Sequence, residues 1–349
     1  MIKKFVSLFL ILIISTLRVS ALNANDISAE CAVVISEQTG EILFEKNPHK
    51  QQSMASTTKI MTSLLAIESG KLQNEIKITE EMIKVEGTSM GLLPGDSVSL
   101  DELLHGMLIQ SGNDAANATA VYLSGSLESF AQSMNTRAKQ IGMNNTNFVT
   151  PSGLDSQEHY STAYDMALLG REAVLNSKFL SVCSKQKATL TYGNPPYSRT
   201  LYNHNKLLDY YEYALGIKTG FTKKSGRCLV SYAKKDGVGL IAVTLNAPND
   251  WQDHRLMLDY GFKNINSFEV NAKIPMSIPV VGGNVDEVKI TTESYIYSSL
   301  NSADIEHRVF LQRFIYAPVK IGEVVGFWRI YSDGKLVKEI PITAAESVI

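Results

Sequence analysis

The chain has 349 residues, of which 44% are hydrophobic, and a formal net charge of −2 at pH 7. This length suits one large domain and a smaller one, and the apolar content is that of an ordinary globular protein. No basic stripe, repeat or low-complexity tract is present, so nucleic acid is not expected as the main partner. Three cysteines cannot form a disulfide framework and allow one bridge at most, so a hydrophobic core must hold the fold.

Residues 1–21 have the pattern of a secretory signal peptide. Two lysines precede an apolar run from Phe5 to Ile14, and the tripeptide ending at Ala21 supplies small residues for cleavage. The apolar run is short for a membrane span, and an uncleaved membrane anchor is the alternative. Cleavage would leave a net charge of −5. We expect export to the periplasm or the extracellular cell-wall space, on the outer side of the cytoplasmic membrane.

The mature chain is predicted to begin with a β-hairpin followed by a helix. Two β-rich runs, 32–35 and 41–44, flank a glycine-containing turn. Residues 57–69 then carry apolar side chains at the i, i+4, i+7 spacing of an amphipathic helix that ends at Gly70. Ser56 is therefore expected at the N-terminus of this helix.

Two more helices are predicted around the middle of the chain. Residues 99–102 resemble a capping box that opens a helix running to about Gln110. A second helix is expected from Asn113 to about Leu123. Ser111 would then lie in the connection between the two helices.

The last third of the chain is predicted to be rich in strands. Residues 216–220, 228–233 and 238–245 read as strands, with a tight turn between the second and the third, and 254–260 reads as a closing helix. Beyond residue 267 further strands are expected at 285–290, 295–298, 308–314, 325–331 and 336–340. We therefore predict a signal peptide over 1–21, a large domain over 22–267 and a small β-rich domain over 268–349.

Three short motifs occur in an order that suggests acyl transfer: Ser56-Thr57-Thr58-Lys59, Ser111-Gly112-Asn113 and Lys218-Thr219-Gly220. S-x-x-K with S-D-N and K-T-G is the signature of class A β-lactamases and penicillin-binding proteins. Each motif is weak alone, because 184–187 and 332–335 also read S-x-x-K, and Lys224-Ser225-Gly226 imitates the third motif. Only one trio has its serine at a helix start, its middle motif between helices and its third motif in a strand.

These residues could carry out nucleophilic catalysis. A serine hydroxyl is a poor nucleophile until a base takes its proton, and Lys59 lies one helical turn after Ser56. A lysine acts as a base when burial or a neighbouring cation such as Lys218 lowers its pKa. Ser111 could relay a proton to the leaving group, and Asn113 could hold either a substrate amide or Lys59.

The same segments could stabilise charge in the substrate. The helix N-terminus at Ser56 offers one backbone N–H to a developing oxyanion, and Phe221 could offer a second from the strand edge. Lys218 and the Thr219 hydroxyl would bind a carboxylate, with Gly220 between them and Phe221. This arrangement suggests a substrate with a free C-terminus.

Ordinary structural roles are the alternative for each of these residues taken singly. Ser56 could be a helix cap, Ser111 and Asn113 ordinary loop or cap residues, and Lys218 a solvated strand lysine. Their joint order, spacing and context favour an enzyme.

Other residues suggest structural roles. The histidines show no pair at metal-ligand spacing, so no metal is expected. Asp165 and Glu172 are interpreted as a solvated helix edge, and Cys228 as a buried strand residue.

The chain resembles the D-alanyl-D-alanine carboxypeptidases, low-molecular-mass penicillin-binding proteins of the serine type. The resemblance covers essentially the whole mature chain. Blocks similar to the family lie at 55–62, 108–116, 147–155, 159–166, 216–222 and 317–322. The resemblance implies an α+β fold of the serine β-lactamase/transpeptidase type, with an antiparallel sheet flanked by helices, a helical insertion and a small all-β C-terminal domain.

The resemblance also implies removal of the terminal D-alanine from peptidoglycan pentapeptides through an acyl-enzyme, covalent capture by β-lactams, and no cofactor. If the roles of the family's motif residues apply here, Ser56 is the nucleophile and Lys59 is the general base. Ser111 and Asn113 would relay the proton and hold the substrate, and Lys218 with Thr219 would bind the carboxylate. The N–H groups of Ser56 and Phe221 would form the oxyanion hole. Family members often have His where Phe221 stands, a departure that bears on substrate preference more than on activity.

The sequence leaves three other functions open. A murein DD-endopeptidase would cleave the same linkage in cross-linked peptides. A β-lactamase would share the acylation groups, but Gly112 replaces the Asp of S-D-N, and no E-x-x-L-N stretch lies between Ser111 and Lys218 to position a deacylating water. A catalytically silent penicillin-sensing protein would keep the fold, and the intact Ser56 and Lys59 argue against it.

Several relatives end in an amphipathic membrane-anchoring helix, which this sequence does not show after its β-rich domain. Three interpretations remain: release into the wall space, peripheral membrane association through a retained signal segment, or a truncated end of the sequence.

Overall fold

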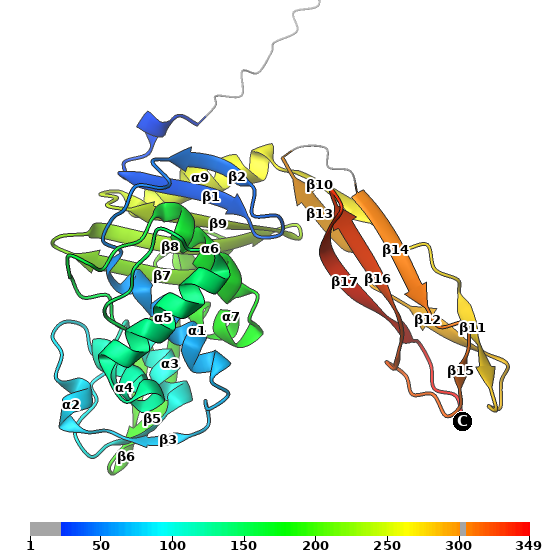
Figure 1. Ribbon diagram of the computed structural model, residues 1–349, viewed down its shortest axis with the longest axis horizontal. Helices are drawn as coiled ribbons and strands as arrows, with labels where there is room; N and C mark the ends of the chain where they lie inside the picture. The colour runs from blue at the N-terminus through cyan, green and yellow to red at the C-terminus, as the bar shows by residue number, and fades with distance from the viewer. Residues whose placement is uncertain (1–21, 301–304) are drawn as a thin grey trace, which may run out of the picture.

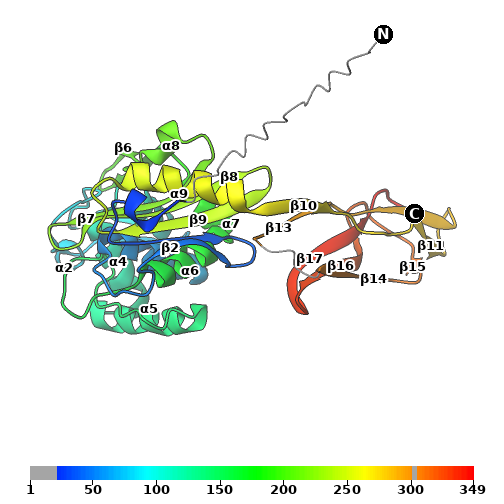
Figure 2. The same ribbon diagram turned by 90° about the horizontal axis from the view of Figure 1, so that it is seen from above.

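The computed structural model describes residues 22–300 and 305–349, so the predicted signal peptide lies outside the described residues. Figures 1 and 2 show a part built from helices and a sheet, followed by an elongated β part that carries the C-terminus. None of the helices in the described ranges is both long and apolar enough to cross a bilayer.

A five-stranded antiparallel sheet in the order β2-β1-β9-β8-β7 forms the centre of the first part. Its strands are β1 Cys31–Ser36, β2 Ile42–Lys46, β7 Ala214–Thr222, β8 Gly226–Lys235 and β9 Val238–Leu245. The N-terminal hairpin and the three later strands predicted from the sequence are confirmed. Every residue of β9 is buried, because helices cover both faces of the sheet. β7 is an edge strand, so its outer side is left for the cleft described below.

Helices cluster on one face of this sheet, and one long helix covers the other (Figure 1). The cluster contains α1 Lys59–Glu68, α2 Glu80–Ile83, α3 Leu100–Leu108, α4 Asn113–Ser124, α5 Leu127–Ile141, α6 Ala163–Val174 and α7 Ser177–Cys183, while α9 Asp250–Asn264 lies on the opposite face with the short α8 Leu207–Tyr210 nearby. Two small antiparallel sheets of two strands each complete this part: β3 Glu75–Lys77 with β4 Ser97–Ser99, and the hairpin of β5 Lys187–Gly193 and β6 Pro196–Tyr202. The 3-10 turns η1 Ala24–Asp26 and η2 Ala55–Thr58 precede β1 and α1.

Local signals placed the strands and helices that carry the three motifs, whereas α2, α5 to α8 and β3 to β6 were not predicted. Two further expectations differ from the structure. The capping box is confirmed, because Glu102 N donates to Ser99 Oγ at 3.2 Å and Ser99 N donates to Glu102 Oε2 at 2.7 Å. Ser56, however, lies in the 3-10 turn η2, and the α-helix itself begins only at Lys59. The interpretation of Asp165 as a solvated edge is wrong, because its buried carboxylate accepts hydrogen bonds from the loop that precedes α6.

The second part consists only of strands. β10 Asn266–Val270 pairs with β13 Tyr295–Ser299, so β10 straddles the predicted boundary at residue 267. A six-stranded sheet follows in the order β14-β16-β17-β12-β11-β15. Its strands are β11 Ser277–Val281, β12 Glu287–Thr291, β14 Ile305–Leu311, β15 Ile315–Tyr316, β16 Val324–Ser332 and β17 Lys335–Ala344. A separate apolar core around the fully buried Trp328 holds this part together.

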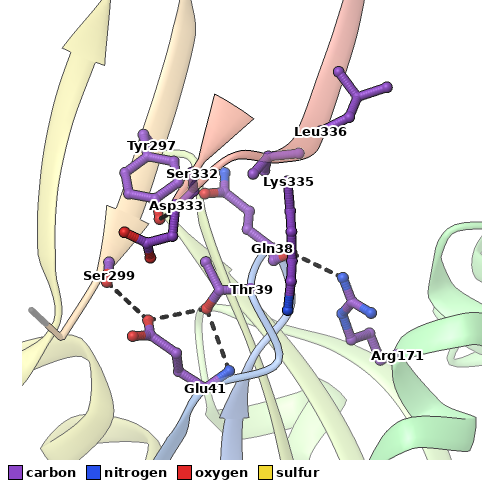
Figure 3. Close-up of a pocket in the computed structure, with 11 residues that line it drawn as sticks. Gln38, Thr39, Glu41, Arg171, Tyr297, Ser299, Ser332, Asp333, Lys335 and Leu336 are labelled. Carbon is purple, nitrogen blue, oxygen red and sulfur yellow. Dashed lines mark hydrogen bonds between the residues drawn. The ribbon is translucent and has the colours of Figure 1, made fainter. Parts of the chain in front are cut away.

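The two parts meet where the β1–β2 turn contacts β13 (Figure 3). The Gln38 amide pairs with this strand as another strand would: its nitrogen donates to Ile296 O at 2.6 Å, and its oxygen accepts from Ser298 N at 3.0 Å. Glu41 accepts from the Ser299 hydroxyl at 2.9 Å. Arg171 of α6 holds the turn by donating to the carbonyl of Gln38 at 2.8 Å. A polar cavity of about 580 Å³ lies beside these contacts.

We predict that Gln38→Ala loosens this junction. The substitution leaves the Ser298 N–H without its acceptor, and an unpaired buried donor costs about 1–3 kcal/mol. Amide exchange in β13, followed by mass spectrometry, should accelerate by about tenfold or more, while the exchange of β8 and β9 stays unchanged. Gln132→Ala on the exposed side of α5 is the matched control. Unchanged exchange in β13 would contradict this account of the junction.

Candidate active site

The first predicted motif brings a serine hydroxyl against a buried lysine amine. Ser56 lies in η2 and Lys59 is the first residue of α1, so the two side chains are one turn apart. Lys59 Nζ is 2.8 Å from Ser56 Oγ. The Lys59 side chain is fully buried, whereas Ser56 borders an open cleft of about 340 Å³.

Three oxygen atoms surround the Lys59 amine. Besides Ser56 Oγ, these are Asn113 Oδ1 and the carbonyl oxygen of Ser152, each at 2.7 Å. The two carbonyl oxygens can only accept, whereas a hydroxyl can also donate. A neutral amine fits this arrangement, because its two N–H bonds would satisfy the carbonyls and its lone pair would face the Ser56 proton.

The electrostatic surroundings favour the neutral form of Lys59. Burial holds the pKa of Lys59 well below its ordinary value, and the nearby charge of Lys218 lowers it further, against an opposing effect of the Asp114 carboxylate. Burial also lowers the pKa of Lys218, to about 7. The charge of Lys218 therefore disfavours the charged form of Lys59, whereas burial is what lowers the pKa of Lys218 itself.

The second motif lies in the connection between α3 and α4, as predicted. Ser111 lines the cleft and has a left-handed φ of 62°, a conformation uncommon for residues other than glycine. Asn113 begins α4, and its Nδ2 donates to Glu86 O at 2.7 Å, which fixes the opposite oxygen toward Lys59. Gly87 makes this possible, because a Cβ there would lie 2.7 Å from Asn113 Nδ2.

The third motif lies on the edge strand β7, on the other side of the cleft. Thr219, Gly220 and Phe221 line the cleft, and the Phe221 side chain is 66% exposed at its mouth. A Cβ on Gly220 would lie 3.0 Å from Ser56 N, so glycine permits the close approach of the strand to the serine. Lys218 is buried instead, and its amine donates to Thr219 O at 2.8 Å.

Asp114 is a buried residue of the site that the sequence reasoning did not single out. Its carboxylate accepts from Ser89 Oγ at 2.6 Å and from the N–H groups of Met90, Gly91 and Leu92 at 2.9–3.1 Å. Asp114 thereby holds the loop whose Glu86 carbonyl orients Asn113. Its position directly after the S-G-N motif is the sequence feature that could have identified Asp114 as a residue of the site.

A cation at the far wall of the cleft was also missed. Arg227 of β8 donates to Asp250 at 2.9 Å and lies over the Trp251 ring at 5.3 Å, and all three residues line the cleft. Arg227 lies opposite Phe221 in the pairing of β7 and β8, a register that the sequence pattern alone did not show.

The described residues contain no cluster of three or more His, Cys, Asp or Glu that could hold a metal ion. The cysteines Cys31, Cys183 and Cys228 are free and buried. Burial raises the pKa of Cys228 to about 11, which makes its thiol a poor nucleophile at neutral pH.

The matches to known families cover nearly all of the chain. The family model for D-alanyl-D-alanine carboxypeptidase matches residues 18–249, and the model for the penicillin-binding protein 5 C-terminal domain matches residues 262–349.

Curated relatives and solved structures agree with these matches. D-alanyl-D-alanine carboxypeptidase DacF of Bacillus subtilis is 32% identical, and the alignment covers 92% of this chain and 86% of DacF. D-alanyl-D-alanine carboxypeptidase DacC of Escherichia coli is 32% identical, and the alignment covers 93% of this chain and 85% of DacC. Penicillin-binding protein 5 from Haemophilus influenzae has a TM-score of 0.66 at 29% identity, over 92% of this chain and 98% of that structure. D-alanyl-D-alanine carboxypeptidase DacD from Francisella tularensis has a TM-score of 0.66 at 27% identity, over 94% of this chain and 95% of that structure.

These likenesses confirm the predicted resemblance and the α+β fold of the transpeptidase type with its all-β C-terminal domain. The chain belongs to the D-alanyl-D-alanine carboxypeptidase family of serine-type penicillin-binding hydrolases.

Proposed function

We propose that the protein removes the terminal D-alanine from peptidoglycan stem pentapeptides through an acyl-enzyme on Ser56. The contact between Ser56 Oγ and the buried Lys59 amine carries this proposal, because it pairs a cleft-facing nucleophile with a base of lowered pKa. Family membership supports the choice of a D-Ala-D-Ala linkage.

Acylation follows from this pairing. Lys59 accepts the Ser56 proton while Oγ bonds to the carbonyl carbon of the penultimate D-alanine. The N–H groups of Ser56 and Phe221 stabilise the oxyanion. The C–N bond then breaks, and Ser111, which lines the same cleft, passes the proton from Lys59 to the departing D-alanine amine.

Deacylation uses the same groups in the reverse direction. Lys59 takes a proton from water, whose oxygen bonds to the acyl carbon. The ester bond to Ser56 breaks, and the hydroxyl recovers its proton. A β-lactam carries a carbonyl and a carboxylate placed like those of the D-Ala-D-Ala substrate. It therefore acylates the same Ser56 hydroxyl.

Substrate binding depends on β7 and on the second motif. Lys218 in its charged form, together with the Thr219 hydroxyl, holds the free carboxylate of the terminal D-alanine. Gly220 lets the peptide approach Ser56 closely, and Asn113 holds Lys59. The mechanism uses no metal or other cofactor.

We place this chemistry in a catalytic domain over 22–267 that precedes a β-rich domain over 268–349. The separate family-model matches over 18–249 and 262–349 support this division, as does the apolar core around Trp328, which is distinct from the two apolar clusters of the first part. The proposed leader over 1–21 directs export to the periplasm or the cell-wall space, where the peptidoglycan stem peptides lie. The proposed partners are these stem peptides and β-lactams, with peripheral association at the membrane surface.

Ser56→Ala should abolish activity without unfolding the protein. We expect the wild type to release one D-alanine from diacetyl-L-Lys-D-Ala-D-Ala and to carry a fluorescent penicillin on Ser56, both detected by mass spectrometry. The variant should do neither, because the attacking atom is gone. Penicillin labelling that persists in Ser56→Ala would refute the nucleophile, and a wild type that is labelled but spares the tripeptide while splitting cross-linked dimers would point to an endopeptidase.

Lys218→Gln should change the pH profile of acylation. Removing the Lys218 charge raises the pKa of Lys59, so the acid limb of the second-order rate of penicillin labelling should move to higher pH. Loss of the charged carboxylate contact should slow labelling near pH 7 by about 10- to 100-fold. The wild type should lose rate as Lys218 deprotonates above about pH 7, and the variant should lack this alkaline limb.

Lys223→Gln is the control for this profile, because Lys223 is an exposed lysine directly after β7. Its profile should match that of the wild type. An acid limb that stays in place in Lys218→Gln would contradict the coupling of the two lysines.

A further inference from the structure

Ala55, the residue before the proposed nucleophile, has a strained backbone. Its φ is 47°, in the left-handed region, and its side chain is buried. An L-residue adopts this conformation at a cost, and such strain persists where the surrounding structure holds it in place.

A directional chain of hydrogen bonds ends on the carbonyl of Ala55. Val149 N donates to His159 Nδ1 at 3.0 Å, so this ring nitrogen must be the acceptor. The proton therefore sits on Nε2, which donates to Thr58 Oγ1 at 2.8 Å. The Thr58 hydroxyl in turn donates to Ala55 O at 2.8 Å.

The neighbourhood of this chain keeps it intact. Thr58 is fully buried and His159 is 2% exposed. Burial, and to a lesser degree the positive charge of Lys224, lowers the pKa of His159 to about 4, so the ring is neutral and the donor order is unchanged at neutral pH.

Gly153 confines the same carbonyl from the other side. A Cβ on Gly153 would overlap the carbonyl oxygen of Ala55 and would also approach Thr58 Oγ1 at 2.8 Å. Gly153 has a φ of 86° and follows Ser152, whose carbonyl accepts from Lys59. One loop thus contacts both the Lys59 amine and the Ala55 carbonyl.

Holding this carbonyl also aims the N–H of Ser56. The Ala55 carbonyl and the Ser56 N–H belong to one planar peptide unit and point in opposite directions. With the oxygen fixed against Thr58 and Gly153, the N–H side faces β7, where Gly220 approaches Ser56 N.

We infer that His159, Thr58 and Gly153 are positioning residues that aim the Ser56 N–H at the substrate oxyanion. This inference rests on the proposed acyl transfer, and it states that these three residues increase the rate of that reaction. They touch no reacting atom, and act by fixing the peptide that carries the oxyanion donor.

Thr58→Val tests the inference, because it removes the hydroxyl with little change of shape. Deleting an oxyanion donor costs about 10²–10³ in kcat, so a misaimed donor should cost about 10- to 100-fold in kcat/KM for the tripeptide. Affinity for a peptide boronic acid, which forms a tetrahedral adduct, should fall by a similar factor. Noncovalent tripeptide affinity, measured in the Ser56→Ala background, should change by less than about twofold.

Two variants serve as controls. Thr58→Ser keeps the hydroxyl and should retain activity near that of the wild type. Thr57→Val removes an equally buried hydroxyl of the same turn, which donates to Met54 O at 2.6 Å and not to the Ser56 peptide. It should lower thermal stability about as much as Thr58→Val and leave boronate affinity unchanged. Equal losses of boronate affinity in the two valine variants would overturn the inference.

A second pair covers the case in which Thr58→Val does not fold. Gly153→Ala should push the Ala55 carbonyl aside and lower kcat/KM by tenfold or more. Gly125→Ala is its match, since Gly125 has a φ of 79° but no atom within 4 Å of an added Cβ, and it should keep wild-type activity. A folded Gly153→Ala with wild-type kcat/KM would overturn the inference. A wild-type protein that neither releases D-alanine nor takes up penicillin would instead refute the proposed function.

Discussion

The burial of the Lys59 amine is the constraint on which the rest of the structure depends. An ammonium group removed from water must find compensating charge or lose its proton. Here the amine contacts two carbonyl oxygens and one hydroxyl, and the effects of burial and of Lys218 on its pKa outweigh that of the Asp114 carboxylate. Loss of the proton satisfies the two carbonyls and leaves a lone pair for Ser56. The same contacts that hold the side chain therefore make it a base.

Each neighbour of Lys59 comes from a different element, so the site forms only when the whole first part has folded. Ser56 comes from the turn before α1, Asn113 from the start of α4, and Ser152 from the loop before α6. The edge strand β7 closes the cleft and supplies Lys218. Close approaches of backbone at Gly220 and Gly153 make this convergence possible, because a side chain at either position would meet the turn that carries Ser56. The β-rich part contacts the opposite end of the sheet, through the β1–β2 turn.

Sequence reasoning succeeded where the signal is local. The hairpin of β1 and β2, the capping box at Ser99 and the strands of the third motif follow from periodicity and turn residues within a few positions. It could propose Ser56, Lys59, Ser111, Asn113 and Lys218 as a set, because a known signature links them. It could not find Arg227 or the relay from His159 to Ala55, since these contacts join segments far apart in the chain. Asp165 was misjudged for the same reason: helix spacing shows which residues share a face, but not what packs against that face.

The protonation state of Lys59 is the central claim, and nuclear magnetic resonance of protein labelled at lysine side chains measures it directly. The signal of Lys59 can be assigned by its absence in Lys59→Arg. The account predicts a neutral Lys59 amine at pH 7 that gains its proton only well below the ordinary range of lysine pKa values. A Lys59 signal that remains that of a charged ammonium from about pH 6 to about pH 9 would contradict it.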